Sequence, residues 1–241
     1  MSTGSKTAVI VQARMGSVRF PGKMMALLCG VPIIEWVLNR LSRCQKVDAV
    51  VLAIPDTSAN APLQEVAWRL NVPVLRGDEA DVLGRFVSAA NTTKADVIVR
   101  VCADNPVVDP EVIDFAIQSY YQLNVDYVFN HVPRLDCLYP DGLGGEVFSA
   151  ALLREIDANA TARSHREHVT SYLWDNAEQY RMMPAPCDEA WRANGDMIRL
   201  DVDEPGDLKK LQSLLEGATP DISAVEILKI WRSKIWGHTA N

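Results

Sequence analysis

The chain has 241 residues, of which 48% are hydrophobic and 23% charged, and its formal net charge is −7 at pH 7. A chain of this size can fold without disulfides, its acidity argues against a nucleic-acid binder, and no apolar run is long enough to span a bilayer. Its five cysteines are irregularly spaced with no CxxC pair, which argues against a disulfide framework and indicates a reduced, cytoplasmic protein.

The first half of the chain predicts alternating strands and helices. Apolar runs that end at polar loops indicate buried strands at Thr7–Val11, Ala49–Ile54, Val72–Leu75, Val97–Cys102 and Tyr127–Asn130. The predicted helices between them begin near Pro32, Asn60, Asp81 and Asp109. This alternation predicts an α/β fold with a mostly parallel central sheet flanked by helices, whose ligands bind beyond the carboxyl ends of the strands.

The alternation stops after about residue 130. The pattern then predicts a Pro- and Gly-rich loop at 131–146, a strand at 147–148, a helix from 149, a helix at 164–176 and an edge strand at 180–183. Residues 197–202 predict a strand that returns to the main sheet, and the final amphipathic segment either packs on the body or meets a partner. We therefore predict a single domain over residues 1–241 with an inserted subdomain at about 131–190.

Positive charge is concentrated near the start of the chain. The first 34 residues contain Lys6, Arg14, Arg19 and Lys23 and no Asp or Glu. A local cationic patch in an acidic protein favours a small anionic ligand over a long polyanion. The alternative is a chance grouping on a solvated loop.

Three of these cationic residues lie in a glycine-containing loop, residues 12–23, between the first predicted strand and the first predicted helix. Gly16 and Gly22 permit close approach of backbone N–H groups to a phosphate, and Arg and Lys side chains supply the opposite charge. The loop therefore predicts phosphate binding, with a basic surface turn as the alternative. The chain has no GxxxxGK[ST] and no GxGxxG motif, which excludes a P-loop protein.

Two acidic residues follow predicted strands and indicate a metal site. Asp104 comes after the strand at 97–102, and Asp203 comes after the strand at 197–202. If these strands lie near each other, both carboxylates can hold one Mg²⁺, which prefers one or two carboxylates, waters and substrate phosphates. The alternative is that both aspartates cap the helices that follow them.

Residues 12–23 read Gln-Ala-Arg-Met-Gly-Ser-x-Arg-x-Pro-Gly-Lys and resemble the signature loop of the cytidylyltransferase family. This family includes CMP-sugar synthetases that act on 3-deoxy-octulosonate and on sialic-type acids, and the chain is most similar to its spore-coat polysaccharide biosynthesis branch. The resemblance covers about residues 7–215, with further matching blocks at 77–86, 100–106, 139–143, 166–170 and 202–208.

The resemblance implies a nucleotide-diphospho-sugar transferase-like, Rossmann-like fold and a homodimer formed through the inserted segment. It also implies a Mg²⁺-dependent enzyme that joins CTP to an acidic sugar, 3-deoxy-octulosonate or a sialic or nonulosonic acid, for surface polysaccharide biosynthesis. The products are a CMP-sugar and pyrophosphate. Neither a nucleic acid nor a membrane is an implied partner.

The resemblance further implies roles for individual residues. Those implied for the nucleotide are Gln12, Ala13, Arg14, Gly16, Ser17, Lys23, Arg85 and Asp104. Those implied for catalysis are Arg14, Lys23 and Asp104, and those for Mg²⁺ are Asp104 and Asp203. Those implied for the sugar are Arg19, Arg166, Glu167 and His168. For Arg85 and for the block at 166–168, the alternative is a solvated helix surface.

The chain departs from the family pattern in two places. Phe20 stands where relatives usually carry Leu, and Leu143-Gly144-Gly145-Glu146 stands where they commonly carry Leu-Asp-Val-Glu. The missing carboxylate motivates a second interpretation, a non-catalytic nucleotide-binding homologue. The DxD string at 201–203 motivates a third, a nucleotide-sugar-dependent glycosyltransferase. Release of pyrophosphate from CTP separates these interpretations.

Overall fold

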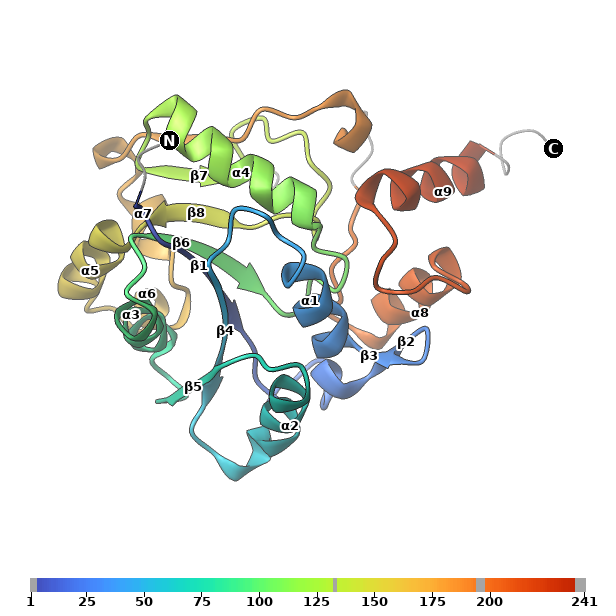
Figure 1. Cartoon of the computed structure of the whole chain (residues 1–241), viewed down its shortest axis with the longest axis horizontal. Helices are drawn as coiled ribbons and strands as arrows, with labels where there is room; N and C mark the ends of the chain where they lie inside the picture. Colours follow the sequence, from blue (N-terminus) through green and yellow to red (C-terminus); the bar gives the residue numbers. More distant parts are fainter. Residues whose placement is uncertain (1–3, 132–133, 194–197, 237–241) are drawn as a thin grey trace.

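A sheet of seven strands forms the centre of the chain, which the computed structural model describes over residues 4–131, 134–193 and 198–236 (Figure 1). Its strands are β1 (Thr7–Gln12), β4 (Ala49–Pro55), β5 (Val74–Gly77), β6 (Val97–Cys102), β7 (Tyr127–Phe129), β8 (Glu146–Ser149) and β9 (Met182–Pro184). Their order across the sheet is β5-β4-β1-β6-β8-β7-β9, and β8 runs antiparallel to both of its neighbours. The other pairs are parallel, which confirms the predicted mostly parallel sheet.

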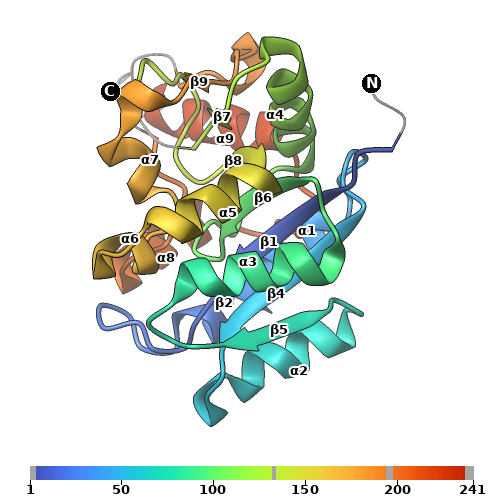
Figure 2. The ribbon, with the colours of Figure 1, turned by 90° about the vertical axis from the view of Figure 1, so that its left-hand side faces the viewer.

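Helices cover both faces of this sheet (Figures 1 and 2). One face carries α1 (Ile33–Leu41), α2 (Ala61–Arg69), α4 (Pro110–Leu123), α8 (Pro205–Leu214) and α9 (Ala224–Trp236). The other carries α3 (Val82–Thr93), α5 (Ala150–Asn159), α6 (Arg163–Glu167) and α7 (Ser171–Asp175). A separate hairpin of β2 (Leu27–Leu28) and β3 (Val31–Pro32) precedes α1. No helix among the described residues has both the length and the apolar character needed to cross a membrane.

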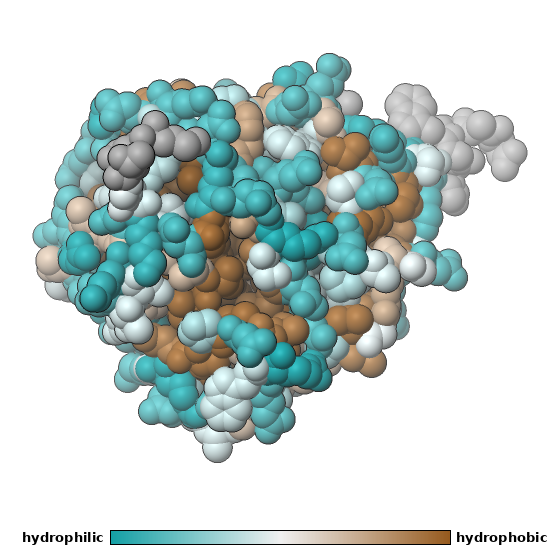
Figure 3. Space-filling model, in the orientation of Figure 1, coloured by the Kyte–Doolittle hydropathy of each residue, from teal (hydrophilic) through white to brown (hydrophobic). Residues whose placement is uncertain are grey.

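Side chains of the central strands alternate between two hydrophobic cores. In β1, Val9 and Val11 join the core beneath α1, α2 and α4, while Ala8 and Ile10 join the core beneath α3 and α5. A strand covered on both faces needs apolar residues on both, which explains why these strands appear in the sequence as continuous apolar runs. On the face turned to the viewer, hydrophobic residues gather in the middle and hydrophilic residues surround them (Figure 3).

Side-chain caps form at two of the four predicted helix starts, whereas α1 and α2 begin directly after Pro32 and Asn60 without such a cap. The Asp81 carboxylate accepts a hydrogen bond from the Gly84 N–H, and the Asp109 carboxylate accepts from the N–H groups of Glu111 and Val112. Such caps satisfy backbone donors that the first helical turn leaves unpaired. The third predicted strand, in contrast, is displaced toward the C-terminus, because β5 extends to Gly77.

Two predictions in the second half are wrong. The helix predicted at 164–176 is divided into α6 and α7, which are separated at residues 168–170. The strand predicted at 197–202 does not join the sheet over residues 198–202, and residue 197 lies outside the described residues. Residues 198–202 instead hydrogen-bond two loops, through an isolated bridge between Asp141 and Arg199 and a bond from the Val202 N–H to the Asp104 carbonyl.

The segment predicted as an insertion at 131–190 contributes β8 and β9 to the central sheet, with β9 at its edge. Its helices α5, α6 and α7 lie on the α3 side. Its assignment as a subdomain for dimerisation or sugar binding stays a prediction. The C-terminal helix α9 packs on the body, where Ala224, Ile227 and Leu228 are buried in the same core as α1.

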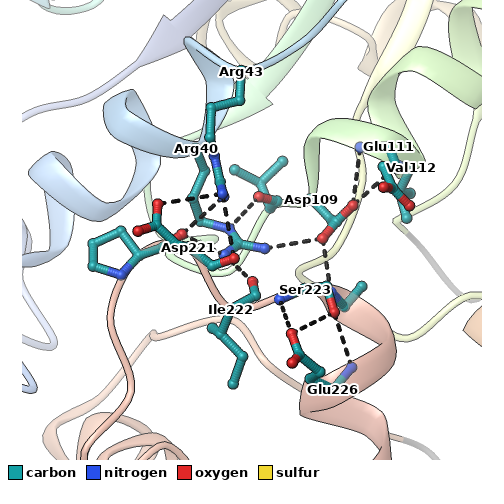
Figure 4. A network of polar contacts seen from close by, with 12 residues as sticks. Arg40, Arg43, Asp109, Glu111, Val112, Asp221, Ile222, Ser223 and Glu226 are labelled. Atoms are coloured by element: carbon teal, nitrogen blue, oxygen red, sulfur yellow. Dashed lines mark hydrogen bonds and ion pairs between the residues drawn. The ribbon is translucent and has the colours of Figure 1, made fainter.

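A buried ion pair joins three distant parts of the fold (Figure 4). The Arg40 guanidinium, at the end of α1, lies 3.1 Å from the Asp109 carboxylate and also donates to the carbonyls of Val108, Pro220 and Ile222. Asp109 caps α4 and accepts a further hydrogen bond from the Ala224 N–H at the start of α9. The pair therefore fixes the C-terminal segment to α1 and α4.

Candidate active site

A cavity of about 400 Å³ opens beyond the carboxyl ends of β1 and β6. The chain continues from β1 to β4 and β5 on one side and places β6 on the other, so the cavity lies where the strand order switches. The predicted site residues that line it are Gln12, Ala13, Arg14, Ser17, Arg19, Lys23, Arg85, Asp104, Glu167, His168 and Asp203. Gly16 and Arg166 are not among the lining residues.

The loop after β1 is held in place by local hydrogen bonds. The Ser17 hydroxyl accepts a hydrogen bond from the Phe20 N–H, and the Lys23 N–H donates to the Phe20 carbonyl. Gly22 has a φ of 72°, a left-handed conformation that favours glycine. From outside the loop, the buried side chain of Asn60 accepts a hydrogen bond from the Met15 N–H. Together these bonds direct Lys23 into the cavity.

Lys23 lies between the two predicted metal ligands. Its Nζ is 3.3 Å from Asp104 Oδ2 and 3.6 Å from Asp203 Oδ1, and it donates a 2.7 Å hydrogen bond to the Val202 carbonyl. The lysine is only 7% exposed. Two acids from distant parts of the chain therefore meet one ammonium group, although 81 and 180 residues separate them from it.

Neither aspartate caps a helix. Asp109 caps α4, and Glu204 with Asp207 forms a capping box at the start of α8. The carboxylates of Asp104 and Asp203 consequently face the cavity, where Asp203 also lies 3.0 Å from Arg19. No cluster of three or more His, Cys, Asp or Glu gathers as a metal site in the described ranges. Two carboxylates beside the cationic loop at 12–23 nevertheless fit Mg²⁺, which prefers one or two carboxylates and takes its remaining ligands from water and substrate phosphates.

Arg14 and Arg85 also contribute positive charge to the cavity lining. Arg14 Nη2 is 3.7 Å from Glu167 Oε1. Arg85 is buried and its Nη1 donates to the carbonyls of Asp78 and Glu79, but its Nε has no hydrogen-bond partner among the described residues. Burial, together with the neighbouring Arg14, lowers the pKa of Arg85. Two cations held this close favour an anionic ligand between them.

The block at 166–168 is divided between the cavity and its surroundings. Glu167 and His168 line the cavity. Arg166 instead binds the Asp81 carboxylate with Nε and Nη2, each at 2.8 Å, and the Asp157 carboxylate with Nη1 at 2.7 Å. These contacts tie α6 to the start of α3 and to α5. The sugar-binding role of Arg166 stays a prediction.

Several lining residues were not predicted as site residues from the sequence: Val18, Met24, Val82, Arg100, Cys102 and Ala103. Arg100 is the most informative of them, because its guanidinium lies on the cavity floor beside the buried carboxylate of Glu146, with Nη1 and Oε1 2.6 Å apart. One signal in the sequence was available. Arg100 interrupts an apolar strand at a spacing that places it on the same face as Cys102, where that strand ends.

The unusual Gly144-Gly145 pair has a structural explanation. A Cβ at Gly144 would overlap the side chain of Asn130, which is fully buried. Asn130 accepts a hydrogen bond from the Gly145 N–H and donates to the Val112 carbonyl. Asn130 therefore occupies the space into which a larger side chain at 144 would extend.

The DxD string is divided in a similar way. Asp203 lines the cavity, whereas Asp201 does not and pairs with Arg199, with Oδ2 and Nη2 2.5 Å apart. Asp201 and Asp203 therefore do not both face the cavity as a pair of metal ligands. Asp203 instead lies near Asp104, because both carboxylates contact the ammonium group of Lys23.

The model of the cytidylyltransferase family matches residues 8–228 of the chain. The spore coat polysaccharide biosynthesis protein SpsF of Bacillus subtilis is 33% identical to it over 228 residues, 92% of each protein. The 3-deoxy-manno-octulosonate cytidylyltransferase of Pelobacter propionicus is 36% identical over 109 residues, 45% of this chain and 42% of that protein. The solved structure of a cytidylyltransferase from Leptospira borgpetersenii has a TM-score of 0.87 and 26% identity and covers 96% of each chain.

Proposed function

The chain belongs to the cytidylyltransferase family, and from this premise we propose that it transfers the cytidylyl group of CTP to an acidic sugar with release of pyrophosphate. The acceptor is a 3-deoxy-octulosonate or a sialic or nonulosonic acid, and the CMP-sugar serves surface polysaccharide biosynthesis. The similarity to SpsF and to a 3-deoxy-manno-octulosonate cytidylyltransferase supports this choice. The observation that carries it is the meeting of Lys23, Asp104 and Asp203 in one cavity.

The triphosphate lies along the loop at 12–23 in this proposal. Backbone N–H groups near Gly16, the Ser17 hydroxyl and the charges of Arg14 and Lys23 hold its oxygens. Arg85, which lines the cavity, contacts the cytosine end.

Asp104 and Asp203 hold Mg²⁺, which when bound neutralises negative charge on the phosphate oxygens. Lys23 and Arg14 stabilise the charge that develops as a sugar hydroxyl attacks the α-phosphorus in line. Lys23 is already held by a carbonyl and two carboxylates, so little reorganisation is needed for it to face the phosphates. In this proposal Arg19, Glu167 and His168 contact the sugar, and all three line the cavity.

Pyrophosphate release tests this function. The protein is incubated with Mg²⁺, each of the four ribonucleoside triphosphates in turn, and a panel of sugar acids and sugar phosphates. We expect release with CTP and at least one sugar acid. Release only with sugar phosphates or with another triphosphate contradicts the proposal, and CTP binding without release across the panel supports the non-catalytic homologue instead.

We further propose that the active form is a cytoplasmic homodimer joined through the segment at 131–190. The support is the resemblance to the family together with the position of β9, whose outer edge has no neighbouring strand in the described part of the sheet. Sedimentation velocity checks this: a dimer at micromolar concentration is expected, and a monomer that retains full activity contradicts it.

A further inference from the structure

Arg100 places a charged group in the floor of the cavity from the middle of a central strand. It lies in β6 directly opposite Glu146 of β8, and its side chain is 11% exposed. Burying an arginine in an apolar strand costs free energy unless the charge is paired. The residues that pair with Arg100 therefore bear on its role. Arg100 lies two residues before Cys102, the last residue of β6, so the two side chains share one face of the strand, and both line the cavity.

Neighbouring side chains fix the guanidinium but do not use all of its donors. Nη1 donates to Glu146 Oε1, Nε donates to Gln12 Oε1 at 3.1 Å, and Nη2 contacts the Cys102 sulfur at 3.3 Å. A guanidinium has five N–H groups, so Nη1 and Nη2 each keep one beyond these contacts. Arg100 is itself one of the residues that line the cavity, so a ligand bound there is a candidate partner for these donors.

Glu146 is held as the anion that keeps Arg100 in place. Its Oε1 also lies 3.1 Å from His131 Nε2. Burial by itself raises the pKa of Glu146, but the Arg100 charge together with the contacts of His131 and Thr170 outweighs it and lowers this pKa to about 2. Because an arginine can only donate, the Gln12 amide must turn its oxygen toward Arg100, which leaves the Gln12 NH₂ group free to donate elsewhere.

The order of the strands indicates which substrate Arg100 meets. Arg85 follows β5, so it lies toward the β4-β5 half of the sheet, and the phosphate-binding loop follows β1 in the middle. Arg100 and Glu146 lie on β6 and β8, in the opposite half. A nucleotide that extends from the loop toward Arg85 therefore leaves the Arg100 side of the cavity to the acceptor.

We propose that Arg100 binds the carboxylate of the acceptor sugar and makes the enzyme select acidic over neutral acceptors, an assignment that rests on the function proposed above. Glu146 is a positioning residue that acts through Arg100. Arg166 is less suited to this task, because Nε, Nη1 and Nη2 of its guanidinium are already engaged by Asp81 and Asp157. Gln12 supplies a second donor to the same carboxylate.

The test compares acids with their neutral analogues in Arg100→Met. The acceptors are 3-deoxy-manno-octulosonate and N-acetylneuraminate, each with its carboxamide, and pyrophosphate release is followed with CTP and Mg²⁺. We expect the KM for the acid to rise about 10- to 100-fold, as for the loss of a hydrogen bond to a charged group. The preference for acid over carboxamide should fall by a similar factor, while the CTP affinity measured by calorimetry stays unchanged.

Two further variants separate recognition from folding. Arg69→Met removes an exposed arginine at the end of α2 that pairs with Glu35 and does not line the cavity, and it should leave all these constants unaltered. The double variant Arg100→Met with Glu146→Gln leaves no unpaired buried charge and should show the same loss of selectivity, even if the single variant folds poorly.

The outcomes distinguish this assignment from the function beneath it. If no sugar acid gives pyrophosphate with the unaltered protein, both are overturned. If sugar acids are used, but a folded Arg100 variant keeps the acid preference and the KM for the acid, the assignment alone is overturned. Equal losses in CTP affinity and sugar KM also overturn it, because Arg100 would then support the site as a whole.

Discussion

Lys23 is buried and contacts three polar groups, and these features determine what its replacement should do. The residue contacts Asp104, Asp203 and the Val202 carbonyl, so it is held at one point rather than moving over a surface. A fixed charge of this kind stabilises a developing negative charge without reorganisation. Its positive charge also offsets the repulsion between the carboxylates of Asp104 and Asp203, because it lies close to both.

We therefore expect Lys23→Ala to lower turnover by about 10²- to 10³-fold, measured as pyrophosphate release at saturating CTP and acceptor. Lys210→Ala is a matched control, because the Lys210 side chain is 84% exposed and forms a long ion pair with Asp207, at 3.9 Å. Turnover in Lys23→Ala equal to that of the control would remove Lys23 from the mechanism.

Asp141 is an acid held in an unfavourable place. Burial and the nearby Asp201 raise its pKa to about 6, above the 3.8 expected in the unfolded chain. The folded protein therefore binds this proton more tightly, and the residue's contribution to stability falls as the pH rises from about 4 to 6.

We expect Asp141→Asn to raise the free energy of unfolding by about 1–3 kcal/mol at pH 7 and by much less at pH 4. Urea denaturation of both proteins at the two pH values checks this, since other groups titrate alike in both and cancel in the difference. A gain of equal size at both pH values would contradict a titration effect.

The Arg40–Asp109 pair acts at the scale of whole elements, since it links the end of α1, the start of α4 and the start of α9 (Figure 4). We expect Asp109→Ala to lower the free energy of unfolding by about 3–5 kcal/mol, because it leaves a buried guanidinium unpaired and removes a helix cap. Chemical denaturation measures this loss.

Asp221→Ala serves as the control for that variant. Asp221 pairs with Arg43 nearby but its side chain is 84% exposed, and exposed pairs contribute about 0–1 kcal/mol. A loss in Asp109→Ala no greater than in the control would mean that the network is not what holds α9 in place.

Elements were predictable from the sequence where their signals are local. Asp81 and Asp109 mark helix starts because a cap forms within three residues of itself. The residues from 164 to 176 have helical spacing, but the structure breaks at 168–170, where Val169 is fully buried beside α3 and α5. Packing against the rest of the fold determines where this helix breaks, so the residue pattern within the segment could not predict it.

For the whole molecule, alternation predicted the class of fold but not the order of its strands. The place of β8 between β6 and β7 depends on pairing across the fold, Arg100 with Glu146 and Val128 with Val147. The return of residues 198–202 was predicted as pairing with the sheet, whereas their backbone bonds go to loops around Asp104 and Asp141. The position of β8 and the course of residues 198–202 both depend on long-range contacts, and the sequence alone does not show which of these contacts form.

In the candidate site, too, residues with a local sequence signal were predicted and a residue that depends on long-range contacts was not. Residues of the loop at 12–23 were found because they are contiguous and chemically distinctive, and Asp104 and Asp203 were found because each follows an apolar run. Arg100 was missed as a site residue because its meaning comes from Glu146 and Gln12, which reach it only in the folded sheet. A charged residue within an apolar strand was the available signal.

The position of β8 has a consequence for how the nascent chain assembles. It fills the gap between β6 and β7 but leaves the ribosome after both. The first 102 residues can complete the parallel half β5-β4-β1-β6, whereas β7 finds its partners only in β8 and β9, which are synthesised later. Until residue 146 emerges, the outer rim of β6 stays open, and a ribosome stalled in this interval presents an unpaired strand to neighbouring chains.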